Sequence, residues 1–189
     1  KFNIIAVFID NGWPMEVYRL REFCERENIP FYYKPTNIGS VVFELRQEKN
    51  PCSLCAKLRR GALTNTAIDL GCNKIALGHH FDDVMETFFL SLFYTGQFRT
   101  FSPVTYQNRS GITLIRPLIY LTQANVRTMA ERLHLPVLEN PCPVSGKTKR
   151  NEIREVVNHL LSLYPELRDR FLNALETADL RNLWPRRVR

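Results

Sequence analysis

Short apolar runs alternate with stretches of helical periodicity along this chain of 189 residues. Residues 2–9 (FNIIAVFI) are apolar on both faces and rich in β-branched and aromatic side chains, which is typical of a buried parallel strand. Residues 74–78 (KIALG) form the clearest run of this kind. Shorter runs predict further strands at residues 31–33, 112–115 and 136–138.

Helices are predicted between these strands because apolar residues recur three or four positions apart. They are expected over residues 15–28, from beyond Cys55 to a glycine cap at Gly71, from Asp82, from Thr122, and twice near the C-terminus. The helix that begins at Asp82 is apolar nearly all round and should be central. Residues 35–51 are expected to be a loop with some helix around 41–46.

The alternation of strands and helices predicts right-handed βαβ units and a parallel sheet, hence an α/β fold. One domain over residues 1–180 is expected, followed by a basic tail at 181–189. Ligands of parallel sheets bind beyond the carboxyl ends of the strands. Two such ends carry Ile9 with Asp10 and Gly78 with His79, so a nucleotide is expected there.

The composition is that of a globular protein, with 44% hydrophobic and 24% charged residues. No apolar run approaches the roughly 20 residues of a membrane span, and no secretory signal is visible. An odd count of five cysteines then predicts a reducing cytoplasm. The sequence starts without methionine and almost inside a strand, so we expect it to be a piece of a longer protein.

The net charge of +7 favours a polyanionic partner such as nucleic acid, although a basic surface also improves solubility. The positive charges follow the cysteines in a repeated pattern. Basic residues stand five, seven and eight positions after Cys52 and again after Cys142: Lys57, Arg59, Arg60 and Lys147, Lys149, Arg150.

Three cysteines form the candidate metal site. Cys52 and Cys55 make a C-x-x-C, and Cys142 stands in Pro-Cys-Pro. Three thiolates suit an open zinc site or a [4Fe-4S] cluster with one free iron, and nearby positive charge stabilises thiolates. A structural zinc site that adds His79 or His80 as fourth ligand is the alternative. The other two cysteines, Cys24 and Cys72, are expected to pack in the core.

Two carboxylates, Asp82 and Asp83, open a predicted helix. Carboxylates there favour the helix dipole, which is a sufficient structural reason for them. A pair of carboxylates beside a strand end is also a common way to manage Mg²⁺ and nucleotide phosphates. Both interpretations stay open at this point.

Four motifs occur in order: N-P-C-S-L-C-x-x-L-R-R-G, I-A-L-G-H-H-x-D-D, I-R-P-L and N-P-C-P-x-x-G-x-T-K-R. Together they resemble the TtcA-like branch of PP-loop ATPases, the tRNA 2-thiocytidine synthesis proteins, over nearly the whole chain. The resemblance implies an adenine nucleotide α-hydrolase-like, Rossmann-like fold. It also implies a [4Fe-4S] cluster on Cys52, Cys55 and Cys142, an ATP site lined by the loop 78–83, and catalytic roles for Asp83 and Arg59.

The sequence departs from this family in one respect. The S-G-G-x-D-S phosphate loop is absent, and residues 2–10 resemble the strand that follows it in the family. The first strand and phosphate loop are therefore expected before Lys1, unless the protein has lost them. Loss would put ATP chemistry in question.

The resemblance implies a cytoplasmic, ATP- and Mg²⁺-dependent tRNA sulfurtransferase that adenylates a base carbonyl and replaces its oxygen by sulfur. Its partners would be tRNA and a sulfur donor, and dimerisation stays open. From the repeated spacing we expect the tRNA backbone to contact five residues: Lys57, Arg60, Lys147, Lys149 and Arg150. The alternatives are an Fe–S sulfurtransferase or desulfurase for a small molecule or free base, and a zinc-stapled RNA-binding module without catalysis.

Overall fold

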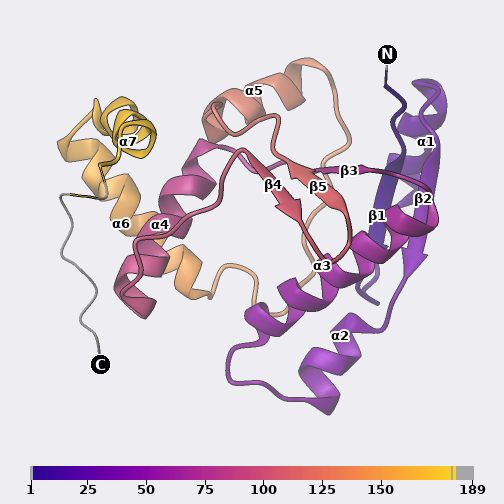
Figure 1. The fold of residues 1–189 in the computed structure, drawn as a ribbon. Helices are drawn as coiled ribbons and strands as arrows, with labels where there is room; N and C mark the ends of the chain where they lie inside the picture. The colour runs from indigo at the N-terminus through magenta and orange to yellow at the C-terminus, as the bar shows by residue number, and fades with distance from the viewer. Residues whose placement is uncertain (1, 180, 182–189) are drawn as a thin grey trace. The chain divides into compact units, whose positions relative to one another are not determined.

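The computed structural model describes residues 2–179 and residue 181 (Figure 1). Apart from Arg181, the predicted basic tail lies outside this range. The chain divides into two compact units, one with Lys1–Val84 and Phe101–Thr148, the other with Met85–Thr100 and the chain from Lys149 onward. In chain order the elements are β1 (Ala6–Asp10), α1 (Tyr18–Arg26), β2 (Phe31–Pro35), α2 (Ile38–Ser40) with a π-helical turn (Val41–Leu45), α3 (Pro51–Asp69), β3 (Lys74–Ala76), α4 (Phe81–Thr95), β4 (Val104–Gln107), β5 (Ile112–Ile115), α5 (Gln123–Arg132), α6 (Lys149–Leu163) and α7 (Leu167–Glu176).

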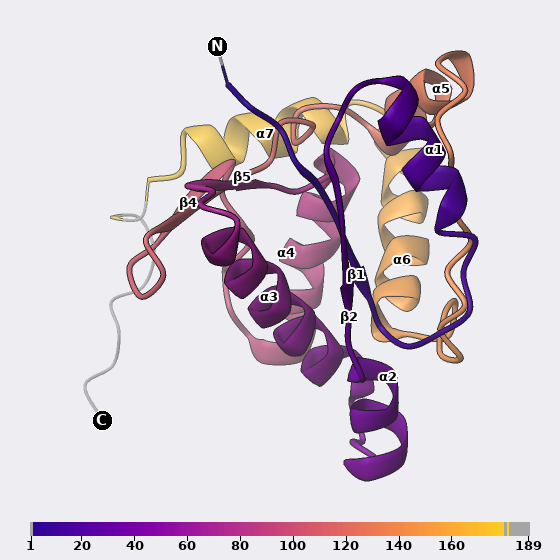
Figure 2. The ribbon, with the colours of Figure 1, turned by 90° about the vertical axis from the view of Figure 1, so that its right-hand side faces the viewer.

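The first unit contains two sheets. Strands β1 and β2 pair in parallel, in a register from Ala6 with Phe31 to Asp10 with Pro35. The second sheet has the order β3-β5-β4, with β3 parallel and β4 antiparallel to β5. Helix α3 contacts both β1 and β3, and α3 and α1 lie on opposite sides of the β1–β2 pair (Figure 2). The predicted α/β class with parallel strands is confirmed. Among the described strands, β1 and β3 each have only one neighbour.

The core of the second sheet forms against α3. Ile75, Ile112 and Leu114 pack with Ala67 of the helix, and all four are buried. The helix ends where the sequence predicts, since Gly71 adopts a left-handed φ of 66° that glycine tolerates without strain. This turn lets the Cys72 N–H donate to the Ala67 carbonyl at 2.8 Å.

Several element boundaries differ from the predictions. β1 starts at Ala6 rather than at residue 2, and Phe2 is 84% exposed. No strand forms at residues 136–138, where Val137 is 70% exposed. In the expected loop 35–51, the helix expected around 41–46 is present as the π-helical turn, and α2 precedes it. Helix α3 begins at Pro51, because proline suits the first helical turn, so it includes both cysteines of the C-x-x-C.

The second unit is built from the later part of α4 with α6 and α7. The Phe88 ring lies 4.8 Å from that of Phe98 and 5.1 Å from that of Phe171, both in edge-on geometry. Glu86, which is 2% exposed, accepts from Arg154 Nε at 2.6 Å and from Arg150 Nη1 at 3.2 Å. A buried carboxylate thus ties α6 to α4.

Replacing Glu86 by alanine should destabilise this unit. Removing one partner of a buried ion pair costs about 3–5 kcal/mol, and the lower end applies because both arginine side chains are 40% exposed. Urea denaturation measures the loss. The control is Glu152→Ala, whose exposed carboxylate binds Lys149 at 2.8 Å and the Tyr94 hydroxyl at 2.6 Å, so its removal should cost much less. Equal losses would refute the special role of Glu86.

Candidate thiolate and nucleotide sites

The three predicted metal ligands come from two distant segments of the first unit. Cys52 and Cys55 occupy the first turns of α3, and Cys142 follows Pro141 in the irregular segment after α5. All three are free thiols. Burial raises the pKa of Cys55, Arg59 lowers it, and the nearby Cys142 and Cys52 raise it further. The fold therefore brings Cys52 and Cys142 within electrostatic reach of Cys55, with Arg59 beside Cys55.

These thiols suit an iron–sulfur cluster chemically. Thiolates are the usual ligands of such clusters, and each binds a different iron, so the three sulfurs need not converge on one point. Among the described residues, no group of three or more His, Cys, Asp or Glu side chains could hold a single metal ion. Cys24 is buried on α1, and Cys72 packs against the core cluster of α3.

At the carboxyl end of β1, the Asp10 side chain is held by the turn that follows the strand and by the neighbouring strand β2. One carboxylate oxygen accepts from the Gly12 N–H at 2.8 Å, and the other accepts from the Tyr33 hydroxyl. The latter bond raises the pKa of Tyr33. The Asp10 carbonyl accepts from the Thr36 hydroxyl at 2.5 Å. The strand end that includes Ile9 and Asp10 is thereby fixed.

The loop 78–83 leads from β3 into α4 and places His80 between two carboxylates. Asp83 Oδ2 accepts from the His80 backbone N–H at 3.1 Å and lies 3.5 Å from His80 Nε2. Asp82 Oδ2 accepts from the Gln123 N–H at 2.6 Å and lies 3.9 Å from His80 Nδ1. The bond to His80 N resembles a capping box, so Asp83 also stabilises the start of α4.

His79 of this loop is part of a cluster with Phe101 and Arg116. The His79 ring lies 4.7 Å from the Phe101 ring, and the Arg116 guanidinium lies 4.8 Å from the centre of that same ring. Arg116 is 8% exposed and donates to the Ser102 carbonyl at 2.6 Å, and burial lowers its pKa. The only sequence signal for Arg116 was the I-R-P-L motif, and nothing marked Phe101.

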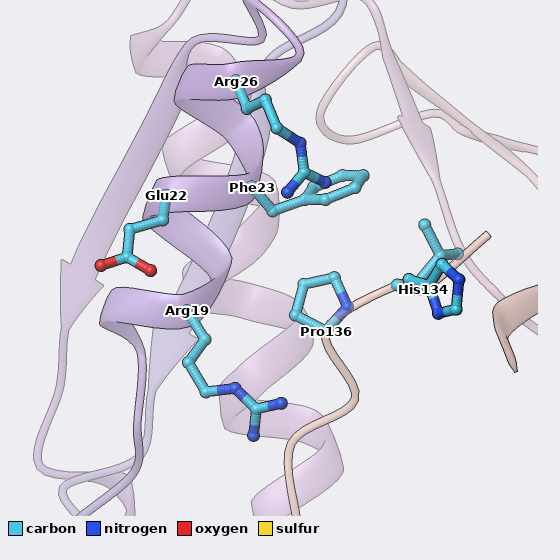
Figure 3. A pocket seen from close by; sticks show the side chains of 7 residues that line it. Arg19, Glu22, Phe23, Arg26, His134 and Pro136 are labelled. Carbon is cyan, nitrogen blue, oxygen red and sulfur yellow. The ribbon is translucent and has the colours of Figure 1, made fainter.

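Two adjoining hollows lie between α1 and the region of α5. The larger, of about 760 Å³, is lined by His80, Gln123, Val126, Arg127, Ala130, Glu131, Val137, Arg19, His134 and Leu135. The smaller, of about 180 Å³, shares the last three of these residues (Figure 3). Its other lining residues are Glu22, Phe23 and Arg26 of α1 and Pro136; Phe23 points toward the side of His134 and Pro136, whereas the Glu22 carboxylate points away from them. No sequence pattern singled out these hollows because their lining comes from separate segments.

The residues expected to contact RNA fall into two classes. Lys57 and Arg60 are exposed on α3, and Lys147 is exposed in the first unit. Lys149 and Arg150 belong to the second unit, where Lys149 binds Glu152. Arg150 donates to Glu86 and to the Thr87 hydroxyl, both at 3.2 Å. Two of the five residues expected to contact RNA, Lys149 and Arg150, are thus already paired with carboxylates of the protein.

The sequence of this chain is similar to a known protein family and to enzymes of known activity. The PP-loop domain family matches residues 11–161. The tRNA-cytidine(32) 2-sulfurtransferase of Pelobacter propionicus is 36% identical over 96% of this chain and 69% of its own length. That of Syntrophotalea carbinolica is 34% identical over 97% of this chain and 72% of its length.

A solved structure shares the fold. The U34-tRNA thiolase NcsA from Methanococcus maripaludis, solved with its [4Fe-4S] cluster, superposes with a TM-score of 0.74 at 23% identity. The match covers 96% of this chain and 63% of the thiolase. In the part of this chain that the structure describes, no helix has the length and apolar character to span a membrane. The chain belongs to the PP-loop family, in the group of the tRNA-cytidine(32) 2-sulfurtransferase enzymes.

Proposed function

We propose that this protein is an ATP-dependent, iron–sulfur-dependent sulfurtransferase that converts a cytidine of tRNA to 2-thiocytidine in the cytoplasm. One observation carries the proposal: the fold brings Cys142 to Cys52 and Cys55 at the start of α3, beside Arg59. The sulfurtransferase relatives at up to 36% identity supply the reaction class. A [4Fe-4S] cluster on these thiolates would supply one iron with an open coordination position.

The reaction has two chemical steps. The C2 carbonyl oxygen of cytidine attacks the α-phosphorus of ATP, and pyrophosphate leaves. A sulfide sulfur then attacks C2, and the C–O bond breaks so that AMP leaves with the former carbonyl oxygen. Positive charge develops on the pyrimidine ring in the first step. A fixed carboxylate stabilises such charge, and we assign this role to Asp83.

The nucleotide is expected at the carboxyl ends of β1 and β3. Ile9, Asp10, Gly78 and His79 lie at these ends, where a parallel sheet binds its ligands. Of the two carboxylates after β3, we assign that of Asp83 to Mg²⁺, which prefers oxygen ligands, whereas that of Asp82 accepts from the Gln123 N–H. Arg59 carries positive charge beside the thiolates, where it would balance the anionic sulfur donor.

The phosphate-binding part of the nucleotide site is a separate proposal. The 189 residues contain no S-G-G-x-D-S, while β1 and β3 each have a single neighbour among the described strands. β1 is also only half-buried at all five positions, although the four residues before Asp10 are apolar. A further parallel strand with a phosphate loop, from a segment outside these residues, would cover β1 and complete the site.

The direct test is anaerobic incubation of the iron-loaded protein with tRNA, ATP and sulfide, followed by mass spectrometry of the nucleosides. 2-Thiocytidine should form only when ATP is present. A brown protein that makes thiolated free base but no thiolated tRNA would favour the small-molecule sulfurtransferase. A colourless protein with stoichiometric zinc that binds RNA without turnover would favour the binding module.

The exposed cations of α3 should contact the tRNA backbone. We expect Lys57→Ala with Arg60→Ala to lower the slope of log affinity against log salt by about 1.4–1.8, because each phosphate contact contributes roughly 0.7–0.9. The control removes Arg21 and Arg132, two exposed arginines of α1 and α5. If both double variants have the same slope of log affinity against log salt, α3 does not contact RNA through Lys57 and Arg60.

A further inference from the structure

A long stretch of the chain carries no negative charge. No Asp or Glu occurs between Glu86 and Glu131. The charged residues in this interval are all arginines, Arg99, Arg109, Arg116 and Arg127. The β4–β5 hairpin lies inside this interval, within the first unit (Figure 1). The hairpin itself therefore contributes no carboxylate that would repel a polyanion.

The hairpin presents an aromatic side chain on its outer strand. β4 lies at the edge of the sheet, and Tyr106 pairs with Thr113 while Val104 pairs with Ile115. Successive residues of a strand face opposite sides, so Val104 and Tyr106 share the face away from buried Ile112 and Leu114. Tyr106 is 62% exposed and Val104 is 59% exposed.

The turn brings positive charge to the same end of the hairpin. Arg109 is exposed in the turn that follows β4. Gly111 has a left-handed φ of 69°, and a Cβ at this position would lie 4.0 Å from the Tyr106 hydroxyl. The Tyr106 side chain therefore reaches toward the turn that holds Arg109.

Hydrogen bonds fix both ends of the hairpin. At the turn, the Ser110 hydroxyl donates to Gln107 Oε1 at 2.9 Å, and the Gly111 N–H donates to the Gln107 carbonyl at 2.9 Å. At the other end, buried Arg116 donates to the Thr105 hydroxyl at 3.3 Å. A platform held in this way loses little conformational freedom on binding.

We propose that the β4–β5 hairpin binds unpaired RNA, with a base stacked on Tyr106 and a neighbouring phosphate bound by Arg109. The inference rests on the proposed function and adds to it a second RNA surface, distinct from the cations of α3. Aromatic side chains next to arginine are the usual components of single-strand binding, because every base has a stacking face and the backbone is anionic. A chain segment free of carboxylates adds no repulsion.

The test compares two RNAs, a stem-loop with an unpaired loop and a duplex of equal length. Tyr106→Ala should weaken stem-loop binding about fivefold or more and leave duplex binding unchanged, because only unpaired bases can stack. The salt slope should stay the same, since stacking releases no counterions. Arg109→Ala should instead reduce that slope by about 0.7. Tyr106→Phe should bind as the wild type does.

The matched control is Tyr18→Ala, which removes a 57% exposed tyrosine from α1. If wild type binds the stem-loop and Tyr106→Ala binds as tightly as Tyr18→Ala, the hairpin surface is refuted while the proposed function stands. If wild type binds neither RNA, the proposed function itself fails.

Sedimentation tests a different occupant of this edge. If the wild type is a dimer and Tyr106→Ala is a monomer, the edge binds a second copy of the chain. Should Tyr106→Ala unfold, the slope measured for Arg109→Ala decides, because Arg109 is an exposed turn residue.

Discussion

Alanine at Cys52, Cys55 or Cys142 is expected to abolish stable iron binding. The free thiols of Cys52 and Cys142 lie within electrostatic reach of Cys55 in the first unit, and each of the three would ligate a different iron of the proposed cluster. Loss of one thiolate leaves too few protein ligands to retain the cluster. Iron content and visible absorption after anaerobic reconstitution measure the effect directly, without any assay of activity.

The controls are Cys24→Ala and Cys72→Ala, which should keep full iron occupancy. Cys24 is 6% exposed on α1, and Cys72 packs against the core of α3. Truncation there should lower the free energy of unfolding instead. Full iron occupancy in any of the three ligand variants would overturn the assignment.

Asp83→Asn should reduce tRNA thiolation by about a hundredfold or more and leave the iron content unchanged. Removing one preorganised electrostatic partner of a transition state commonly costs about 10²–10³ in rate. The Asn amide oxygen can still accept from the His80 N–H, now 3.1 Å from Asp83 Oδ2, so the start of α4 should stay capped. Single-turnover formation of 2-thiocytidine is the measurement.

Asp82→Asn provides the comparison for this variant. Its Oδ2 accepts from the Gln123 N–H, a bond that an amide oxygen can also make, and we assign it no role in activation. Asp82→Asn should therefore retain most of the activity, and both variants should unfold near the wild-type temperature. If Asp83→Asn works as fast as Asp82→Asn, then Asp83 serves only to cap the helix.

Local patterns were sufficient for much of the fold. The apolar runs at residues 31–33, 74–78 and 112–115 become β2, β3 and β5, and the glycine at 71 ends α3 because glycine adopts the left-handed turn without strain. Even so, the run at residues 2–9 predicted too long a strand. Phe2 and Ile4 have the right composition, but hydrogen bonding to β2 begins only at Ala6.

Periodicity could not find β4. Val104, Thr105 and Tyr106 are all exposed, so no alternation of apolar and polar residues marks the strand, and pairing with β5 creates it. The reverse holds for residues 136–138, which have a strand-like composition but no strand to pair with among the described residues. Strand formation at the edge of a sheet thus depends on a partner far away in the sequence.

For the candidate site too, the sequence and the tertiary structure determined different things. The sequence alone determined which reactive groups are present: three thiols in two similar settings, and a loop with histidines and carboxylates after a buried strand. It also indicated the family through these motifs. Only the tertiary structure decided which groups meet: Cys142 with Cys55, His80 with Asp82 and Asp83, and Arg150 with Glu86 rather than with solvent. The reason is physical. Composition and spacing set the local backbone and the types of side chain, whereas contacts between distant segments depend on how the helices and strands pack.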